Sequence, residues 1–448
     1  MGQEHHLSWL KFLPGFIRIR LEGRVALHKI IGNIGWLLFD HFLRMGLGLL
    51  VAVWLARYLG PGQFGIFNYA SAFVALFGEV AALGIDIIVV REIVRDPLSR
   101  EEILGTAFVL KFLTGVLAFL VTVKAVFVLR PHDPTTCMFV AIVAAGMLFR
   151  PFDAIDLWFQ SQVQSKLPVL AKNAAFIIVA LAKVLLILLA APLIAFAWTG
   201  LAEIVLGAIG LLMAYRLKGL RLQAWAPNWG RAKSLINDGW PLLLSAVAIM
   251  GYTRLNVLIL GELAGNTEVG IFSVAYRFVE VWYLVPMVIL RSFMPSIVEA
   301  KEIGEALFYL KLQKLYNLMA FVGYVAAIIT TIFSTQLIHF LLGEAYRKAG
   351  PMLAILTWAG IFTNLGVGRG AFLTTMNWTK ISLLTVSLGC IINIILNFIL
   401  IPRYGAMGAI VACCFTFLVA SYLSCFLYKP LHRTGIMLTK ALIYPKIW

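Results

Sequence analysis

The sequence predicts an all-α, polytopic membrane protein with about twelve transmembrane helices, arranged as two six-helix bundles. Three observations support this fold class. Apolar segments recur at the length that a bilayer requires, basic residues gather in alternate connections, and a short motif repeats in the two halves. The composition agrees, because 61% of the 448 residues are apolar and only 13% are charged, whereas an ordinary soluble chain has about 25% charged residues.

The apolar segments each come close to the ~20 residues that a membrane-spanning helix needs. The fourth segment is the least regular, since Arg150, Asp153 and Asp156 interrupt it. In chain order, the expected spans are residues 36–55, 64–90, 104–129, 137–158, 169–190, 193–215, 239–260, 270–295, 316–342, 353–375, 381–401 and 407–427.

Lysine and arginine are concentrated in every second connection. They cluster near residues 91–100, 166–172, 216–233, 301–314 and 380 and in both terminal segments, whereas the opposite connections hold few of them. By the positive-inside rule, both termini are expected on the cytoplasmic side of the membrane. The same rule explains the net charge of +16, so no nucleic-acid partner is expected.

The widest polar break follows the sixth span and divides the chain into halves. Gly65-Ile66-Phe67 opens the second span and Gly270-Ile271-Phe272 opens the eighth, and alanine and phenylalanine follow each motif at the same spacing. Six helices per half make the repeats parallel, and the alternative is a chance recurrence of common residues. The expected domains are a basic amphipathic cytoplasmic arm (1–32), an N-terminal six-helix bundle (33–216), a cytoplasmic linker (217–238), a C-terminal six-helix bundle (239–428) and a basic cytoplasmic tail (429–448).

The arm has two interpretations of equal weight, a surface helix lying on the membrane and a disordered basic segment. It has no apolar core followed by a small-residue cleavage site, so no cleavable signal peptide is expected.

Several short motifs resemble those of one transporter family. An Arg-Tyr-Leu-Gly-Pro hairpin occupies residues 57–61, Gly84-Ile85-Asp86 follows it, and Gly343-Glu344-Ala345-Tyr346 precedes the tenth span. Together with residues 401–409, they make the chain similar to Wzx-type polysaccharide (O-antigen or lipid-linked oligosaccharide) flippases. These belong to the multidrug/oligosaccharidyl-lipid/polysaccharide exporter superfamily. The resemblance runs from about residue 33 to residue 427 and does not identify the sugar.

The resemblance implies two bundles around a central cavity that opens alternately to either side. It implies transport of a polyprenyl-pyrophosphate-linked glycan from the inner to the outer leaflet of a cytoplasmic membrane. The implied partners are this glycan lipid, the bilayer and polysaccharide polymerase or assembly proteins, and no cofactor is implied. A lipid II flippase and a cation-coupled multidrug exporter of the same superfamily are the alternatives.

Basic residues inside the spans are candidates for function, because a charge at mid-bilayer costs at least ~2.5–3.5 kcal/mol on insertion scales. Arg44 and Arg254 lie on equivalent helices of the two halves, where a cavity between repeats is expected. Arg277 and Arg291 share a stripe of the eighth span. These four are the expected substrate-binding residues, because arginine offers paired hydrogen bonds to a pyrophosphate. A role in helix packing is the alternative for each.

Intramembrane carboxylates are candidates for ion coupling or for ion pairs with these arginines. They are Asp40, Glu203 and Glu280, since a desolvated carboxyl group binds a proton more readily. Asp40 lies four residues before Arg44, and Glu280 lies three after Arg277, spacings that suit either a structural bridge or a cavity lining. The sequence leaves proton coupling, sodium coupling and uncoupled transport open.

Motifs for enzymatic chemistry are missing from the sequence. It has no phosphate-binding loop, no nucleophile elbow and no metal-ligand spacing among its five cysteines. No catalytic residue and no metal site are therefore expected. A membrane glycosyltransferase or polymerase is the distant alternative, but it would be expected to carry an acidic motif or a large outer loop. Gly366, Gly368 and Gly370 surround Arg369, which suits a hinge or, more readily, close helix packing.

Overall fold

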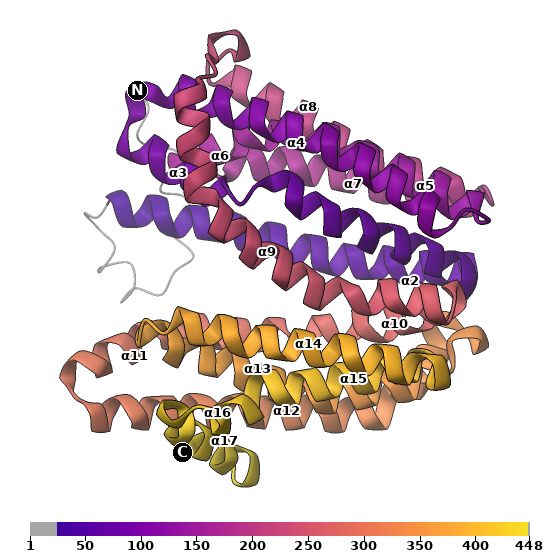
Figure 1. The fold of residues 1–448 in the computed structure, drawn as a ribbon, viewed down its shortest axis with the longest axis vertical. Helices are drawn as coiled ribbons and strands as arrows, with labels where there is room; N and C mark the ends of the chain where they lie inside the picture. The colour runs from indigo at the N-terminus through magenta and orange to yellow at the C-terminus, as the bar shows by residue number, and fades with distance from the viewer. Residues whose placement is uncertain (1–24, 447–448) are drawn as a thin grey trace, which may run out of the picture.

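The computed structural model describes residues 25–446, and every regular element within that range is a helix (Figure 1). Ten helices in this part of the chain are long and apolar enough to cross a membrane. One of the ten, Gly35–Arg95, contains the first two predicted spans. The seventh predicted span lies on a further long helix, Trp229–Leu263, which is not among the ten. Each of the twelve predicted spans falls on a helix or on consecutive helices. The predicted all-α membrane fold is confirmed.

The first group of helices, called here the N-lobe, contains the first six predicted spans. Its helices are α2 (Val25–Ala82), α3 (Asp86–Arg95), α4 (Arg100–Leu129), α5 (Pro134–Ala144), α6 (Asp153–Ser161), α7 (Lys166–Leu188) and α8 (Leu193–Leu217). The 58-residue α2 is two spans joined at Gly60, whose φ of 68° is non-helical. Pro61 follows, so the first two predicted spans are separated by a kink that glycine and proline together permit.

The fourth predicted span is not one continuous helix. Two short 3₁₀ segments, Ala145–Leu148 and Arg150–Phe152, lie between α5 and α6. Pro151 lies in the second of them, and a proline in this position cannot donate a backbone hydrogen bond. The interruption sets Arg150 and Asp153 beside the interior of the N-lobe.

The second group of helices, called here the C-lobe, follows α9. Figure 1 shows the two lobes lying side by side. The remaining helices are α9 (Trp229–Leu263), α10 (Asn266–Trp282), α11 (Leu284–Ile303), α12 (Glu305–Leu342), α13 (Ala349–Thr375), α14 (Thr379–Tyr404), α15 (Ala406–Leu418), α16 (Ser424–Leu427) and α17 (His432–Ile443). The C-lobe comprises α10 to α17. The eighth predicted span, residues 270–295, is divided between α10 and α11, because α10 ends at Trp282 and α11 begins at Leu284.

Helix α9 connects the lobes by packing on both of them. Asn228 caps its start by accepting hydrogen bonds from the backbone N–H groups of Gly230 (2.7 Å) and Arg231 (3.3 Å). The helix thus begins ten residues before the predicted span. It packs against α2, α3 and α4 of the N-lobe and against α14.

The two terminal segments differ in what the structure describes. Residues 1–24 of the predicted basic arm lie outside the described residues. The C-terminal segment includes α17, which packs on α12 of the C-lobe. Tyr324 donates a hydrogen bond to the Leu442 carbonyl at 2.8 Å, so this basic segment is a helix of the C-lobe over His432–Ile443.

The repeated Gly-Ile-Phe motifs meet where α2 crosses α10. A Cβ atom on Gly65 would overlap the carbonyl oxygen of Asn266, and one on Gly270 would overlap that of Pro61. Only glycine permits this approach of two helix backbones. The equivalent motifs of the two halves are thus in mutual contact at the end of the bundle predicted to face outward.

Side-chain contacts close the lobes together at the same end. Tyr69 donates to Glu262 at 2.5 Å, and Arg130 donates to Glu262 at 2.9 Å and to Asn266 at 2.7 Å. Tyr346 of the C-lobe donates to the Ala56 carbonyl of α2 at 2.9 Å. At the opposite end, α11 packs chiefly on α12 and α13 of its own lobe. The lobes are therefore held together at the predicted outer end.

Candidate functional site

A small cavity between the lobes brings together residues of α2 and α10. It has a volume of about 170 Å³ and is lined by Arg44, Arg277 and Glu280 together with Met45, Gly48, Leu49 and Val281. Arg277 and Glu280 are exposed side chains. Two arginines and one carboxylate from helices of different lobes thus face one accessible space.

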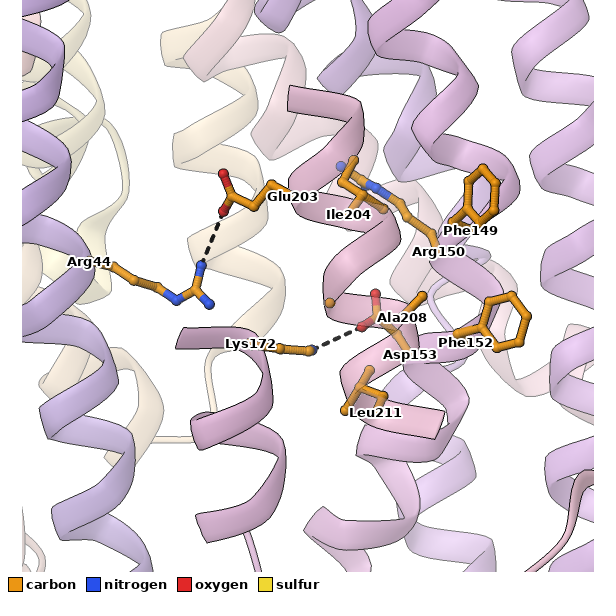
Figure 2. Close-up of a pocket in the computed structure, with 11 residues that line it drawn as sticks. Arg44, Phe149, Arg150, Phe152, Asp153, Lys172, Glu203, Ile204, Ala208 and Leu211 are labelled. Carbon is orange, nitrogen blue, oxygen red and sulfur yellow. Dashed lines mark hydrogen bonds and ion pairs between the residues drawn. The ribbon is translucent and has the colours of Figure 1, made fainter. Parts of the chain in front are cut away.

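A second cavity lies inside the N-lobe and shares Arg44 with the first (Figure 2). Its volume is about 250 Å³, and its charged lining residues besides Arg44 are Arg150, Asp153, Lys172 and Glu203. Arg44 is positioned between the two cavities because α2 lies between the N-lobe interior and α10.

Arg44 is held by two carboxylates, one from its own helix and one from α8. Its Nε donates to Asp40 at 2.8 Å, one helical turn away, and its second ion pair reaches Glu203 at 3.4 Å. Figure 2 shows the pair with Glu203 across the cavity. The guanidinium also lies over the Phe176 ring, 5.2 Å from the ring centre. Because these side chains are 31%, 29% and 28% exposed, water or a ligand can still reach the charges.

Arg254 of α9 extends the group across the lobe interface. Its Nε atom is buried and has no hydrogen-bond partner among the residues that the structure describes. Arg277 and Arg254 are the two cations that act electrostatically on the Glu280 carboxylate. The predicted pair of Arg277 and Glu280 is not an ion pair within 4 Å in the described part of the chain, so both groups face the cavity instead.

Lys183 of α7 belongs to the same group, although it was not among the predicted site residues. Its ammonium interacts electrostatically with Glu203 and with Arg277 of the other lobe. Its position inside an apolar span was a usable signal in the sequence. The direction in which α7 turns it depends on packing against α8 and α2, which the sequence alone does not specify.

Arg291 is the predicted substrate-binding residue that the structure does not bring into this group. It is an exposed residue of α11 and lines neither cavity. The stripe expected to join it to Arg277 assumes one continuous helix, but the helix breaks at Tyr283. The break changes the face on which Arg291 lies.

Asp153 has a different partner from the one its sequence position suggests. The local spacing favours Arg150, three residues away, but Lys172 of α7 binds Asp153 at 2.9 Å and Asp156 at 2.8 Å. Figure 2 shows Lys172 pointing at Asp153. The 3₁₀ segment before α6 ends the regular helical spacing on which the local pair would depend.

The charges at the lobe interface are nearly balanced. Four basic side chains, Arg44, Lys183, Arg254 and Arg277, accompany three carboxylates, Asp40, Glu203 and Glu280. An entering anion would displace a carboxylate from an arginine that is already in place. Arginine suits this exchange, because its planar fork binds carboxylate and phosphate oxygens alike. Among the described residues, no group of three or more His, Cys, Asp or Glu is placed to hold a metal ion.

Comparison with known proteins identifies relatives across most of the chain. It is 24% identical over 397 residues to the probable flippase AglR of Haloferax volcanii, covering 84% of this chain and 79% of that protein. It is also 24% identical over 233 residues to the probable low-salt glycan biosynthesis flippase Agl15 of the same organism, covering 49% of this chain and 48% of that protein.

Solved structures share the fold. An inward-facing multidrug resistance MATE family transporter of the MOP superfamily superposes with a TM-score of 0.71 at 14% identity, covering 91% of this chain and 99% of that one. The lipid II flippase MurJ in an inward closed conformation superposes with a TM-score of 0.68 at 16% identity, covering 91% of this chain and 90% of that one. An outward-facing MATE transporter superposes with a TM-score of 0.56 at 14% identity, covering 92% of this chain and 96% of that one.

The family comparison covers more than half of the chain. Residues 30–301 match the family described as "Polysaccharide biosynthesis protein". This range includes the N-lobe from residue 30 onward, α9, α10 and Arg44, Arg254 and Arg277. It agrees with the resemblance to polysaccharide exporters that the hairpin motifs indicate. The chain belongs to the polysaccharide biosynthesis protein family.

Proposed function

We propose that this protein is a flippase that moves a polyprenyl-pyrophosphate-linked oligosaccharide from the cytoplasmic to the outer leaflet. The observation that carries the proposal is the cavity between the lobes, where Arg44 and Arg277 face Glu280 in a member of a polysaccharide biosynthesis family. Two relatives in Haloferax volcanii bear the name of probable flippases, one matched over 84% of this chain and the other over 49%.

The arginines would bind the pyrophosphate by ion exchange. Arg44 is already paired with Asp40 and Glu203, and the unpaired Nε of Arg254 is a further donor. A pyrophosphate that contacts Arg44 and Arg277 would replace carboxylate contacts by phosphate contacts of similar geometry. Binding would therefore need little reorganisation of the guanidinium groups, and the released carboxylates would remain beside Lys183.

The small excess of positive charge favours an anionic substrate over an organic cation. The neutralised arginines also keep the cost of charge in the membrane low while the cavity awaits its substrate. The polyprenyl tail would stay in lipid, because each CH₂ group moved into a polar cavity forfeits ~0.8 kcal/mol. The headgroup would pass between the lobes.

The proposed direction of transport is supported by which end of the protein is closed. The contacts of Gly65 with α10 and of Arg130 with Asn266 join the lobes at the end predicted to face outward. We take this arrangement as the state that accepts substrate from the cytoplasm, with both termini cytoplasmic. Parting of α2 and α10 at that end would then release the headgroup outward.

Asp40, Glu203 and Glu280 are the groups through which a coupling ion would act, and proton, sodium and uncoupled transport make different predictions. Proton coupling predicts that an imposed pH gradient drives flipping, and sodium coupling that a sodium gradient does. Uncoupled transport predicts no response to either gradient. Glu203→Gln should remove a proton response that depends on this carboxylate.

The test of function is flipping of a fluorescent polyprenyl-pyrophosphate oligosaccharide by the purified protein in liposomes. The wild-type protein should expose the label to a membrane-impermeant quencher, and Arg277→Ala should reduce the rate of this flipping at least tenfold. Arg277→Lys should recover only part of the flipping rate, since an ammonium lacks the guanidinium fork. Arg57→Ala is the matched control, because Arg57 is an exposed arginine that lines neither cavity.

Two results would contradict the proposal. Absence of flipping by correctly folded wild-type protein, judged by its melting temperature, would remove the function itself. Equal rates for wild type and Arg277→Ala would remove the cavity between the lobes from the substrate path.

A further inference from the structure

A second arginine site lies inside the C-lobe, apart from the cavities already described. Arg369 of α13 is only 4% exposed. It donates hydrogen bonds to Ser424 Oγ at 2.8 Å, to Thr385 Oγ1 at 3.0 Å and to Cys425 Sγ at 3.6 Å. These acceptors come from α14 and α16, so Arg369 connects three helices of the lobe.

All three acceptors are neutral, and the charge of Arg369 is not balanced. In the described part of the chain, no carboxylate oxygen lies within 4 Å of its nitrogens. The Ser424 hydroxyl donates its own proton to the Ala420 carbonyl at 2.9 Å, and Thr385 donates to Ser382 at 3.0 Å. Both hydroxyls are therefore ordinary hydrogen-bonded groups. A buried, uncompensated charge is strongly unfavourable in a protein interior.

Two buried donors at this place have no hydrogen-bond partner in the described part of the chain. They are Arg369 Nε and the Tyr316 hydroxyl of α12. Tyr316 is fully buried, and its ring lies 3.1 Å from the position that a Cβ atom on Gly368 would take. The two residues also interact electrostatically. Nearly all buried donors in proteins are satisfied, so this pair indicates a bound acceptor.

The helix geometry around Arg369 supports a binding site rather than simple packing. A π-helical segment, Val419–Leu423, directly precedes Ser424 and Cys425, and such segments occur frequently at functional sites. Gly366 approaches Ser421 closely and Gly368 approaches Tyr316, as the close-packing interpretation of these glycines predicts. Because the helices approach so closely here, the group that we consider for this site is a small one.

Chemistry decides between water and an anion. A water molecule would accept hydrogen bonds from the two donors but would leave the guanidinium charge unbalanced. A monovalent anion accepts the same hydrogen bonds and also neutralises the charge. We propose that Arg369 and Tyr316 hold a halide-sized inorganic anion, of which chloride is the physiological example, inside the C-lobe. The anion would tie α12, α13, α14 and α16 together.

The test is the melting temperature of the purified, detergent-solubilised protein as chloride or bromide replaces gluconate at constant ionic strength. Gluconate is too large for the site. Wild type should gain a few degrees along a saturable curve, because a ligand that binds only the folded state raises the melting temperature. A bromide anomalous-scattering peak beside Arg369 Nε in crystals is the direct readout.

Two variants and a control separate this site from other anion effects. Tyr316→Phe keeps the ring and should weaken halide binding by about tenfold, the loss of one hydrogen bond to a charged group. Arg369→Gln should abolish the halide response. Arg403→Gln removes an exposed positive charge and should leave the response unchanged.

A wild-type protein that melts at the same temperature in halide and in gluconate would overturn the proposal. A halide response that persists unchanged in both Arg369→Gln and Tyr316→Phe would overturn it as well. Neither result depends on substrate flipping, so the proposed transport function stands or falls separately.

Discussion

At the scale of single residues, the sequence predicted the position of three of the four favoured arginines. The cost of a charge in lipid identified Arg44, Arg254 and Arg277, and all three lie at the lobe interface. Local spacing correctly paired Asp40 with Arg44. The partner 159 residues away, Glu203, could not be predicted, because it depends on how α8 is rotated about its axis.

The bridge from Arg44 to Asp40 and Glu203 should be measurable as stability. Arg44→Ala leaves two carboxylates without their cation and should lower the free energy of unfolding by about 1–2 kcal/mol. This is less than the ~3–5 kcal/mol lost when one partner of a fully buried ion pair is removed, because these side chains are partly exposed. Adding Glu203→Gln to Arg44→Ala should recover part of the loss. Thermal unfolding of the single and double variants measures this, and a double variant less stable than Arg44→Ala would refute the bridge.

Asp133, in the connection before α5, predicts a pH dependence of stability. Burial opposes its ionisation, but hydrogen bonds from the Thr136 side chain and backbone and the charge of Arg130 hold its pKa below the ordinary value. A depressed pKa means stability that is present above the unfolded-state value of ~3.9 and lost as pH falls through the folded-state value. The melting temperature should therefore drop below about pH 4.

The variant Asp133→Asn separates this group from other carboxylates. It should lose roughly 0.3–1 kcal/mol of stability at neutral pH, because asparagine keeps the helix cap but lacks the negative charge beside Arg130 and the start of α5, and it should show a smaller decline in acid than wild type. Equal acid declines in the two proteins would mean that Asp133 does not contribute.

At the scale of helices, the sequence predicted where the spans lie better than where they break. Pro286 lacks a backbone N–H and clashes with the carbonyl four residues earlier, Trp282, which is where α10 ends. The stripe that placed Arg291 beside Arg277 overlooked this break. Helix α17 was also missed, because its pattern of buried residues emerges only when it packs on α12.

The crossing of α2 and α10 should depend on glycine. Gly65→Val would force the two helix backbones apart at the predicted outer end, because the side chain would overlap Asn266. The variant should flip the glycan lipid at least several-fold more slowly and admit water-soluble thiol reagents to cysteines placed near the crossing.

Gly200→Val is the matched control for that substitution. Gly200 also lies in a membrane-spanning helix, α8, but a Cβ atom there has no neighbour within 4 Å. Similar flipping defects in Gly65→Val and Gly200→Val would show that the loss reflects general helix damage and not separation of the lobes.

At the scale of the whole molecule, the proposed transport requires two lobes that part at one end and close at the other. The described state is joined at the end where Gly65 meets α10 and where Tyr346 binds Ala56. Alternation between the two openings is the remaining element of the proposal.

A reversible cross-link between the lobes tests this central claim most directly. A Cβ atom on Gly62 of α2 would lie 3.6 Å from Thr267 Oγ1 of α10, so Gly62→Cys with Thr267→Cys can form a disulfide. The pair is introduced after the five native cysteines are replaced. In liposomes, the reduced protein should flip the polyprenyl-pyrophosphate oligosaccharide, the oxidised protein should stop, and reduction should restore the rate. Undiminished flipping with the disulfide fully formed would contradict the account.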